Sequence, residues 1–357
     1  MRTLIFVLLF SVISTGGMAD VKLQRIGGTL FHPWGLSLLN NTEALVTERR
    51  GKLFRINLTT GERSEISNVP KAFTERQGGL LDILVHNPDT TRPDVYFCYS
   101  RRTSKGAATA VNKAVLDGNA LVQQDVIFTA NNSSWKSVHF GCRLAIVKDH
   151  LFISLGDRGQ RHSAQDGLSH GGSVVRLGLN GSVPNNNHVN EGWLPELLTK
   201  GHRNPQGMAI YPATGDIWIN EHGPKGGDEI NILQPGENYG WPLLSFGREY
   251  SGGQVGEGQT SKKGYADSVW HWTPSIAPSG MAFYEGEMFP EFTGKLLVSS
   301  LKFRSVYLVD LDNGKPVKET AILKNEIGRI RDIEIAADGS ILILTDEDRG
   351  GVYRLYR

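Results

Sequence analysis

Two residues suited to acid–base chemistry flank a pair of predicted strands near the middle of the chain. His139 stands shortly before the apolar run 143–146, and Asp157 follows the run 151–155. An imidazole can accept a proton near neutral pH, and a neighbouring carboxylate can orient the ring and favour its charged form. Taken singly, the histidine is also typical of a hydrogen-bonded structural residue, and the aspartate of a turn. General-base catalysis is therefore a hypothesis that requires the two residues to meet in space.

Several cations stand close to other predicted strands. Arg203 and Asn204 lie in the polar stretch 201–207, where a guanidinium fork suits carboxylates or quinone oxygens. Lys302, Arg329 and Arg331 accompany the last strands. Arg329 and Arg331 alternate, so an extended segment can direct both side chains to the same side. Each cation alone is typical of surface charge, but together they indicate a ligand with several negative charges.

Residues 221–231 combine carboxylates with a glycine-rich backbone. Calcium prefers oxygen ligands from carboxylates and backbone carbonyls, and this stretch offers both. Its spacing does not match an EF-hand, and a solvated acidic loop is the alternative. The sequence contains no P-loop, no G-x-S-x-G elbow and no H-E-x-x-H pattern.

The elements that must position these residues are short strands. No long helical period is visible, and runs of Val, Ile, Leu, Phe and Tyr alternate with turn residues among 42 glycines. A unit of two or three strands recurs six times, beginning near residues 34, 79, 143, 206, 279 and 331. This repeat predicts an all-β, six-bladed β-propeller, with a β-sandwich or two β-domains as the alternative. We expect insertions at residues 100–140, 156–173, 180–202 and 236–276.

Composition and the N-terminus limit the class of protein. The 38 basic and 37 acidic residues argue against a nucleic-acid binder and give no sign of attraction to a membrane surface. Residues 1–19 have the charged, apolar and small-residue regions of a signal peptide, which predicts export to the periplasm and one domain over 20–357. Cys98 and Cys142 could form a disulfide, and two buried free thiols are an equal alternative.

Several stretches, in this order, resemble the soluble quinoprotein aldose sugar dehydrogenases, which use pyrroloquinoline quinone (PQQ). The resemblance covers nearly all of the chain after residue 19. It is carried by segments 32–36, 77–82, 139–144, 201–208, 220–231, 238–242, 277–284 and 329–332.

The resemblance implies a six-bladed propeller that oxidises an aldose at C1 to a lactone with PQQ and Ca²⁺. His139 would be the base, Asp157 would orient it, and Arg203 would polarise the quinone. The implied PQQ contacts are Gln77, Arg203, Asn204, Ser275, Lys302, Arg329 and Arg331. Calcium would bind the backbone oxygens of Gly223 and Pro224, and a second calcium would bind Glu229 and Tyr239, with Asp228 assisting. Electrons would pass to a quinone, cytochrome or dye, and the protein would be a monomer or homodimer without stable membrane insertion.

Three positions depart from the family pattern and leave the substrate preference open. Val138 and Ser173 stand where relatives carry a polar residue and a lysine, and Cys142 replaces a glycine. Two other functions remain as alternatives: a non-enzymatic propeller that binds a protein or glycan, and a calcium-dependent lactonase.

Overall fold

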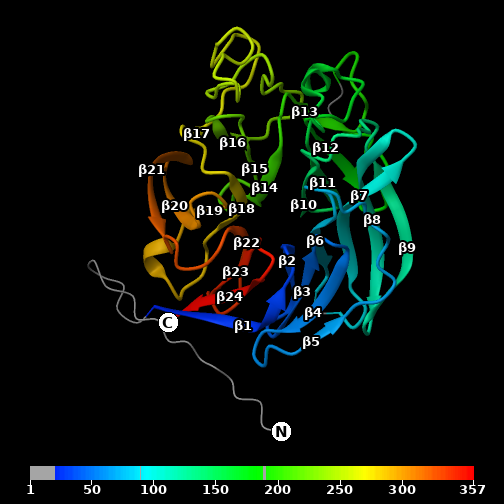
Figure 1. Cartoon of the computed structure of the whole chain (residues 1–357), viewed down its shortest axis with the longest axis vertical. Helices are drawn as coiled ribbons and strands as arrows, with labels where there is room; N and C mark the ends of the chain where they lie inside the picture. Colours follow the sequence, from blue (N-terminus) through cyan, green and yellow to red (C-terminus); the bar gives the residue numbers. More distant parts are fainter. Residues whose placement is uncertain (1–20, 89, 188–189) are drawn as a thin grey trace.

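The computed structural model describes residues 21–88, 90–187 and 190–357, and these residues form six four-stranded antiparallel sheets. Figure 1 shows the sheets arranged around a common axis as the blades of a propeller. The prediction of a six-bladed propeller is therefore confirmed. The predicted signal peptide, residues 1–19, lies outside the described residues.

Each blade is numbered by its place in the chain. Blade I has β2 (Pro33–Asn40), β3 (Glu43–Glu48), β4 (Lys52–Asn57) and β5 (Arg63–Glu65). Blade II has β6 (Leu80–His86), β7 (Asp94–Thr103), β8 (Gly106–Asp117) and β9 (Ala120–Thr129). Blade III has β10 (Gly141–Val147), β11 (His150–Leu155), β12 (Ser173–Gly178) and β13 (Leu197–Lys200). Blade IV has β14 (Pro205–Ile210), β15 (Ile217–Glu221), β16 (Asp228–Ile232) and β17 (Trp270–Trp272). Blade V has β18 (Pro278–Phe283), β19 (Leu296–Ser300), β20 (Ser305–Asp312) and β21 (Lys315–Ile322). Blade VI has β22 (Ile330–Ile335), β23 (Ile341–Thr345), β24 (Gly350–Tyr356) and β1 (Lys22–Leu30). Two short 3₁₀ helices, η1 (Arg161–Gln165) and η2 (Pro290–Phe292), complete the described elements.

Both ends of the described chain meet in one blade. The N-terminal strand β1 pairs with the C-terminal strand β24, from Lys22 opposite Tyr356 to Leu30 opposite Gly350. The ring is also closed at its centre, because the first strand of each blade contacts the first strands of both neighbouring blades. This closure fixes the positions of the strand ends that surround the axis.

Apolar side chains fill the spaces between neighbouring blades. Leu45 and Leu53 of blade I pack in one cluster with Ile83 and Phe97 of blade II. The strands β11 and β23 are almost continuously buried, since another blade covers each of their faces. Burial of one such side chain contributes about 1.5–3 kcal/mol, so the stacking of blades, rather than any single sheet, forms the core.

A register irregularity occurs at the start of the first strand of every described blade, between this strand and the second. Such bulges redirect side chains and strengthen the local twist. The irregular segments contain Trp34, Asp82, Arg143, Gln206 and Arg331, whose contacts with one another join different blades near the axis. Polar side chains are therefore concentrated at one end of the propeller centre.

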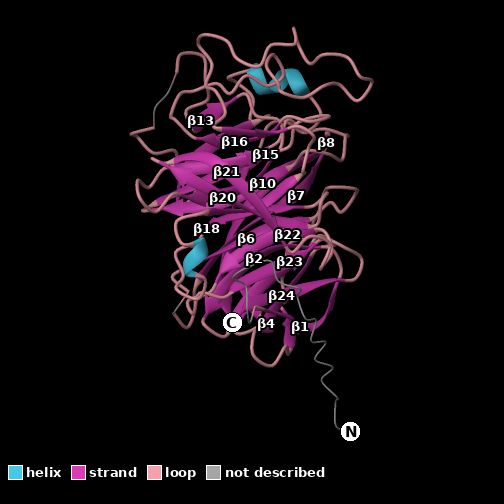
Figure 2. Cartoon of the chain, turned by 90° about the vertical axis from the view of Figure 1, so that its left-hand side faces the viewer, coloured by secondary structure: helices cyan, strands magenta, loops and turns pink. Residues whose placement is uncertain are grey.

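The insertion expected at residues 100–140 is wrong in part, because it contains β8 and β9. The outer strands β13 and β17 likewise fall inside expected insertions. The described remainder of 156–173, 180–202 and 236–276 is loop, apart from the short helix η1 and Ser173, which begins β12, and Figure 2 shows loops gathered at one end of the molecule. The described part of the chain holds no helix with the length and apolar character needed to cross a bilayer.

Cys98 and Cys142 are free thiols, and both are fully buried. The Cys98 Sγ lies 3.7 Å from the carbonyl oxygen of Cys142. Of the two alternatives open from the sequence, the structure has the buried free thiols.

Candidate active site

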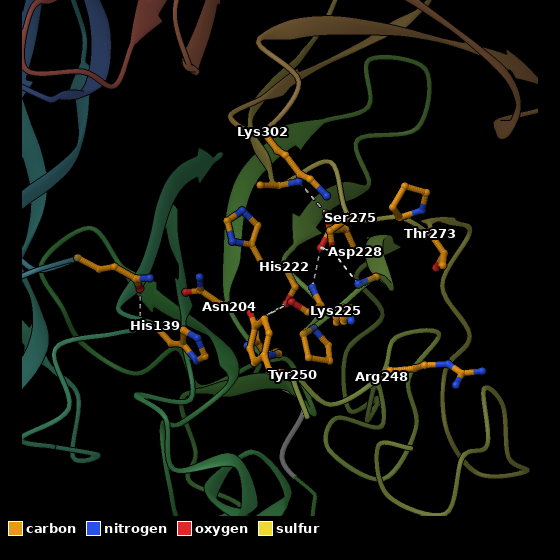
Figure 3. Close-up of a pocket in the computed structure, with 17 residues that line it drawn as sticks. His139, Asn204, His222, Lys225, Asp228, Arg248, Tyr250, Thr273, Ser275 and Lys302 are labelled. Carbon is orange, nitrogen blue, oxygen red and sulfur yellow. Dashed lines mark hydrogen bonds between the residues drawn. The ribbon is translucent and has the colours of Figure 1, made fainter. Parts of the chain in front are cut away.

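A cavity of about 640 Å³ opens where first strands begin and second strands end. Its volume lies in the range of sites for small molecules and cofactors. Figure 3 shows side chains from several blades around it, including His139, Asn204, His222 and Lys302. The lining residues are Gln77, His139, Arg203, Asn204, His222, Gly223, Pro224, Lys225, Gly226, Asp228, Arg248, Tyr250, Thr273, Pro274, Ser275, Ala277 and Lys302.

His139 and Asp157 form the pair that the sequence suggested. The His139 Nδ1 lies 2.7 Å from Asp157 Oδ1, and the Asp157 side chain is 1% exposed. A carboxylate only accepts, so Nδ1 carries the proton and Nε2 retains its lone pair. The His139 backbone N–H donates to Gln77 Oε1 at 2.7 Å. The base therefore has a fixed tautomer and an anchored backbone.

Burial, hydrogen bonds and neighbouring charges set the protonation states of His139 and Asp157. Burial lowers the pKa of His139, the hydrogen bond that its Nδ1 donates to Asp157 opposes this, and the Arg203 charge adds to the lowering. Burial alone would raise the pKa of Asp157, but hydrogen bonds from His139, Gly159 and Trp241 outweigh it and lower the pKa. The result is a neutral imidazole next to an ionised carboxylate near neutral pH.

Arg203 is a buried cation at the same cavity. Its Nη1 donates to the carbonyl oxygens of His222 at 3.1 Å and Gly223 at 2.8 Å. Its backbone N–H donates to the buried Glu221 carboxylate at 2.6 Å. The Nε of Arg203 is buried with no partner among the described residues, so it is an unsatisfied donor in the cavity wall.

The loop that carries Gly223 and Pro224 is tied to the loop before β18 through one carboxylate. Asp228 accepts hydrogen bonds from the Gly223 backbone at 2.9 Å, from Ser275 Oγ at 3.0 Å and from the Ala277 backbone at 2.8 Å. A side chain at position 223 would place Cβ 2.2 Å from the Gly227 carbonyl oxygen, so only glycine fits there. Asp228 therefore fixes both loops as one wall of the cavity.

The described residues contain no group of three or more His, Cys, Asp or Glu side chains able to hold a metal. A calcium at Gly223 and Pro224 would consequently depend on backbone carbonyl oxygens and on a bound ligand. The Gly223 oxygen already accepts from Arg203, but a carbonyl oxygen has two lone pairs and can serve a cation as well. The donor set fits a hard cation such as calcium.

Glu229 and Tyr239 line a separate small cavity of about 20 Å³, together with Glu221. Burial raises the pKa of Glu229 well above its usual range, and the Glu221 carboxylate adds to this effect. The Tyr239 hydroxyl is occupied, because it accepts from the Gln234 N–H and donates to the Ile232 carbonyl. A cation in this cavity would relieve the repulsion between the Glu221 and Glu229 carboxyl groups.

The cations predicted for an anionic ligand are only partly brought together. Lys302 and Ser275 line the cavity, whereas Arg329 and Arg331 are not among its lining residues. Arg331 is buried, donates to Gln206 Oε1 at 2.9 Å and pairs with Asp346 Oδ2 at 2.7 Å. Arg329 is exposed, and its Nη1 lies 3.3 Å from the Leu301 carbonyl oxygen. Arg331 is thus buried and Arg329 exposed, although the Arg329 charge still acts on Arg331.

Sequence reasoning assigned no role to eight residues of the cavity wall, and four of these have large polar side chains. His222 and Lys225 stand within the predicted calcium stretch, and Arg248 and Tyr250 lie on the long loop 236–276. Burial lowers the pKa of His222 to about 3, and its Nε2 donates to the Pro278 carbonyl, so this imidazole is neutral. The length of the loop was the one signal that could have pointed to Arg248 and Tyr250.

Comparison with known proteins gives a consistent group of relatives. The family model described as Glucose / Sorbosone dehydrogenase matches residues 30–354. Aldose sugar dehydrogenase YliI of Escherichia coli (strain K12) is 36% identical over 345 residues, which cover 94% of this chain and 93% of the relative. The crystal structure of the soluble aldose sugar dehydrogenase of Escherichia coli in the apo form has a TM-score of 0.90 at 36% identity, with 94% and 99% of the two chains covered. The PQQ-bound form of an aldose sugar dehydrogenase from Streptomyces coelicolor has a TM-score of 0.79 at 25% identity, covering 94% and 98%.

Proposed function

The chain belongs to the glucose/sorbosone dehydrogenase family and is an oxidoreductase, and we propose that it oxidises aldose sugars at C1 to lactones with PQQ and calcium. One observation carries the proposal. The oriented base His139 lines the same cavity as Arg203, Asn204, Ser275 and Lys302. A non-enzymatic propeller would have no need of an imidazole with a fixed tautomer beside these groups.

The cavity wall offers partners for an acidic, planar cofactor. Gln77 and Asn204 have side-chain amides that can donate hydrogen bonds, Lys302 and Arg203 supply positive charge, and Ser275 lies in the same wall. Gly223 and Pro224 can supply carbonyl oxygens to the calcium, and Glu229 with the Tyr239 backbone can hold a second one. Arg329 and Arg331 remain predictions from the family resemblance. When bound, PQQ with calcium supplies an electrophilic quinone that accepts the C1 hydrogen with its electron pair.

The residues of the chain handle the proton. His139 Nε2 accepts the proton of the C1 hydroxyl as the C1–H bond breaks, and the oxygen left at C1 becomes the lactone carbonyl. Asp157 stabilises the imidazolium that forms, and it holds the ring so that Nε2 stays available. Arg203 places a fixed positive charge where negative charge develops on the acceptor oxygen.

Reconstitution tests this function. The purified chain, freed of divalent ions, should bind PQQ with a change in the PQQ absorbance spectrum, and more tightly when Ca²⁺ is present. The loaded protein should then reduce a redox dye in the presence of aldoses, with the lactone as product. A loaded protein that oxidises no member of a broad aldose panel would contradict the proposal. Lactone hydrolysis with calcium alone would instead favour the lactonase.

Export to the periplasm is a separate part of the proposal, and it depends on residues 1–19. We expect the protein to be recovered from a periplasmic fraction with a new N-terminus at or near Asp20. N-terminal sequencing of the exported protein measures this directly. A protein that retains Met1 in the cytosolic fraction would contradict export.

A further inference from the structure

Among the described residues, Trp241 is the only side chain other than His139 that donates a hydrogen bond to the Asp157 carboxylate. Its indole Nε1–H donates to Asp157 Oδ2 at 2.9 Å. The other oxygen, Oδ1, accepts from His139 Nδ1 and from the Gly159 backbone, each at 2.7 Å. Trp241 and Asp157 are 6% and 1% exposed, so this contact is shielded from water. Both carboxylate oxygens are thus assigned, and Trp241 holds the one that faces away from the base.

The indole is itself held in place from several sides. The Trp241 backbone N–H donates to the Gly201 carbonyl at 2.9 Å, and its carbonyl accepts from Gln165 Nε2 at 2.7 Å. The guanidinium carbons of Arg161 and Arg203 lie 5.1 Å and 5.3 Å from the ring centroid. Such contacts are attractive because the ring face is electron-rich. The ring therefore connects the cation proposed to polarise the quinone with the acid that orients the base.

We propose that Trp241 is a positioning residue for the base: its indole N–H fixes the orientation of the Asp157 carboxylate, and through it the imidazole of His139. This role deepens the proposed function and rests on it for the reaction itself. Without the indole donor, one carboxylate oxygen would be unbound, so the carboxylate could rotate and would no longer hold the imidazole at one angle. A hydrogen bond to an ionised acceptor is about twice as strong as a neutral one, which makes the indole an effective restraint.

The variant Trp241→Phe removes the N–H donor but keeps an aromatic face for the guanidinium groups of Arg161 and Arg203. It therefore tests the hydrogen bond independently of the ring contacts. Without the donor, more of the Asp157 charge acts on the imidazole, so the pKa of His139 should rise. The other charged or titratable groups that act on this pair, Arg158, Arg161, Arg203 and His222, are unchanged in the variant.

The decisive measurement is an NMR titration of ¹⁵N-histidine in the full, calcium-loaded chain, with His139→Gln to assign the resonance. We expect a higher pKa for His139 in Trp241→Phe than in the parent protein. In the PQQ-loaded enzyme, kcat should fall by about ten- to a hundredfold, the range seen for groups that orient a reacting residue. The acid limb of the kcat/KM profile should move to higher pH.

Trp272→Phe is the matched control. Trp272 is 5% exposed, and its Nε1 donates to Glu319 Oε2 at 2.5 Å, so the variant loses the same kind of bond elsewhere. The pKa of His139 in Trp272→Phe should equal the pKa of His139 in the parent protein. An unchanged His139 pKa in Trp241→Phe, or an equal rise in Trp272→Phe, would overturn the positioning role.

A second measurement needs no change at position 241. The indole N–H proton resonance of Trp241 should move upfield in Asp157→Asn, because a neutral amide oxygen is a weaker acceptor than a carboxylate. A resonance that stays in place would overturn the role as well. Should the loaded enzyme oxidise no aldose while the His139 shift appears, the proposed function fails and the positioning role stands.

Discussion

At the scale of single residues, protonation state decides what the cavity can do. A general base has to be neutral when substrate binds, and burial with the Arg203 charge keeps the imidazole of His139 neutral. His222 is neutral for a similar reason, but its Nε2 proton is held by the Pro278 carbonyl. The two histidines of one cavity therefore differ in role, because only His139 has a carboxylate partner.

Removal of the base gives the first prediction. His139→Gln should bind PQQ nearly as well as the parent protein, since the backbone N–H that meets Gln77 is retained. Its kcat should fall by about 10²–10⁴, the usual contribution of a general base. Steady-state dye reduction, together with a PQQ titration of the same preparation, measures both quantities. Retention of more than about a tenth of the parent kcat would show that another group takes the proton.

The pH profile gives a second prediction. His139 is active when neutral, and its pKa is lowered from 6.5 by burial first and by Arg203. The acid limb of kcat/KM should therefore lie below pH 6.5, and activity should be lost only as the pH falls through the lowered pKa. The measurement is kcat/KM against pH at constant ionic strength in the loaded enzyme. A midpoint above pH 7 would contradict the assignment.

Much of the residue set could be predicted from the sequence, and one part could not. His139, Asp157, Arg203 and Lys302 are polar residues at strand ends, and strand ends of different blades meet at the axis. Arg331 is different, because its partner Asp346 follows another strand of the same blade and Gln206 belongs to blade IV. Alternation along a strand predicts which face of the sheet a side chain lies on. It does not predict which residue of another strand pairs with the charge of that side chain.

At the scale of elements, the His139–Asp157 pair is one version of a contact that recurs in four blades. In each of them a carboxylate ends or follows the second strand: Glu48, Asp157, Glu221 and Asp346. Each accepts from a residue that precedes a first strand: Glu48 from the Phe31 backbone, Asp157 from His139, Glu221 from the Arg203 backbone and Asp346 from His32. The repeat thus supplies the acid, and a histidine at one cavity-facing position supplies the base of the proposed reaction.

A carboxylate that joins two loops gives the element-scale prediction. Asp228→Asn places an amide group among three hydrogen-bond donors, from Gly223, Ser275 and Ala277. We expect the free energy of unfolding to fall by about 1–3 kcal/mol, because buried donors lose their acceptor. Affinity for PQQ and calcium should fall too, since both loops line the cavity. Denaturant unfolding and PQQ titration measure the two effects.

Glu48→Gln is the control for this prediction. Glu48 is buried and accepts from the Phe31 backbone at 2.8 Å, away from the cavity lining. The free energy of unfolding of Glu48→Gln should fall to a similar extent, but this variant should keep its affinity for PQQ. Equal losses of PQQ affinity in both variants would mean that Asp228 acts only through overall stability.

The strands that sequence patterns identified are the inner three of five blades and the inner two of blade II, where β8 fell inside an expected insertion. They are apolar because neighbouring blades cover both faces. The outer strands were missed: β5 is fully exposed, and β1 and β21 are mostly exposed, so their sequences carry no apolar period. The pairing of β1 with β24 is also invisible in a local pattern, because it joins the two ends of the chain.

At the scale of the whole molecule, an ion-pair network joins blades across the axis. Arg143 of β10 pairs with Asp82 of β6 at 2.7 Å and with Asp332 of β22 at 2.9 Å, and its guanidinium lies 4.5 Å from the Trp34 ring centroid. The Asp332 carboxylate also accepts from the Leu36 backbone. Strands from four blades are thereby linked at one buried guanidinium.

Loss of that cation should destabilise the whole ring. Arg143→Met leaves Asp82 and Asp332 buried without their partner, and removal of one member of a buried ion pair typically costs about 3–5 kcal/mol. We expect the midpoint of denaturant unfolding to fall accordingly in the apo protein. Arg354→Met is the control, because Arg354 pairs with Asp338 at a partly exposed site. A loss no larger than that of the control would contradict a central role for Arg143.

Glu334, on the same inner strand as Asp332, gives the last prediction. Burial first, and then the charges of Asp332 and Asp82, raise its pKa from 4.5 to about 8. The folded protein therefore keeps a proton that the unfolded chain releases above pH 4.5, so stability falls as the pH rises from about 4.5 to 8, by at most about 1.4 kcal/mol per pH unit. Glu334→Gln removes this dependence, so its gain in unfolding free energy over the parent protein should grow across that window and level off above it. Denaturant unfolding at pH 5 and pH 9 measures the gain, with the exposed Glu62→Gln as control. An equal gain at both pH values would mean that Glu334 is already ionised in the folded protein at pH 5, because water or a cation reaches its carboxylate.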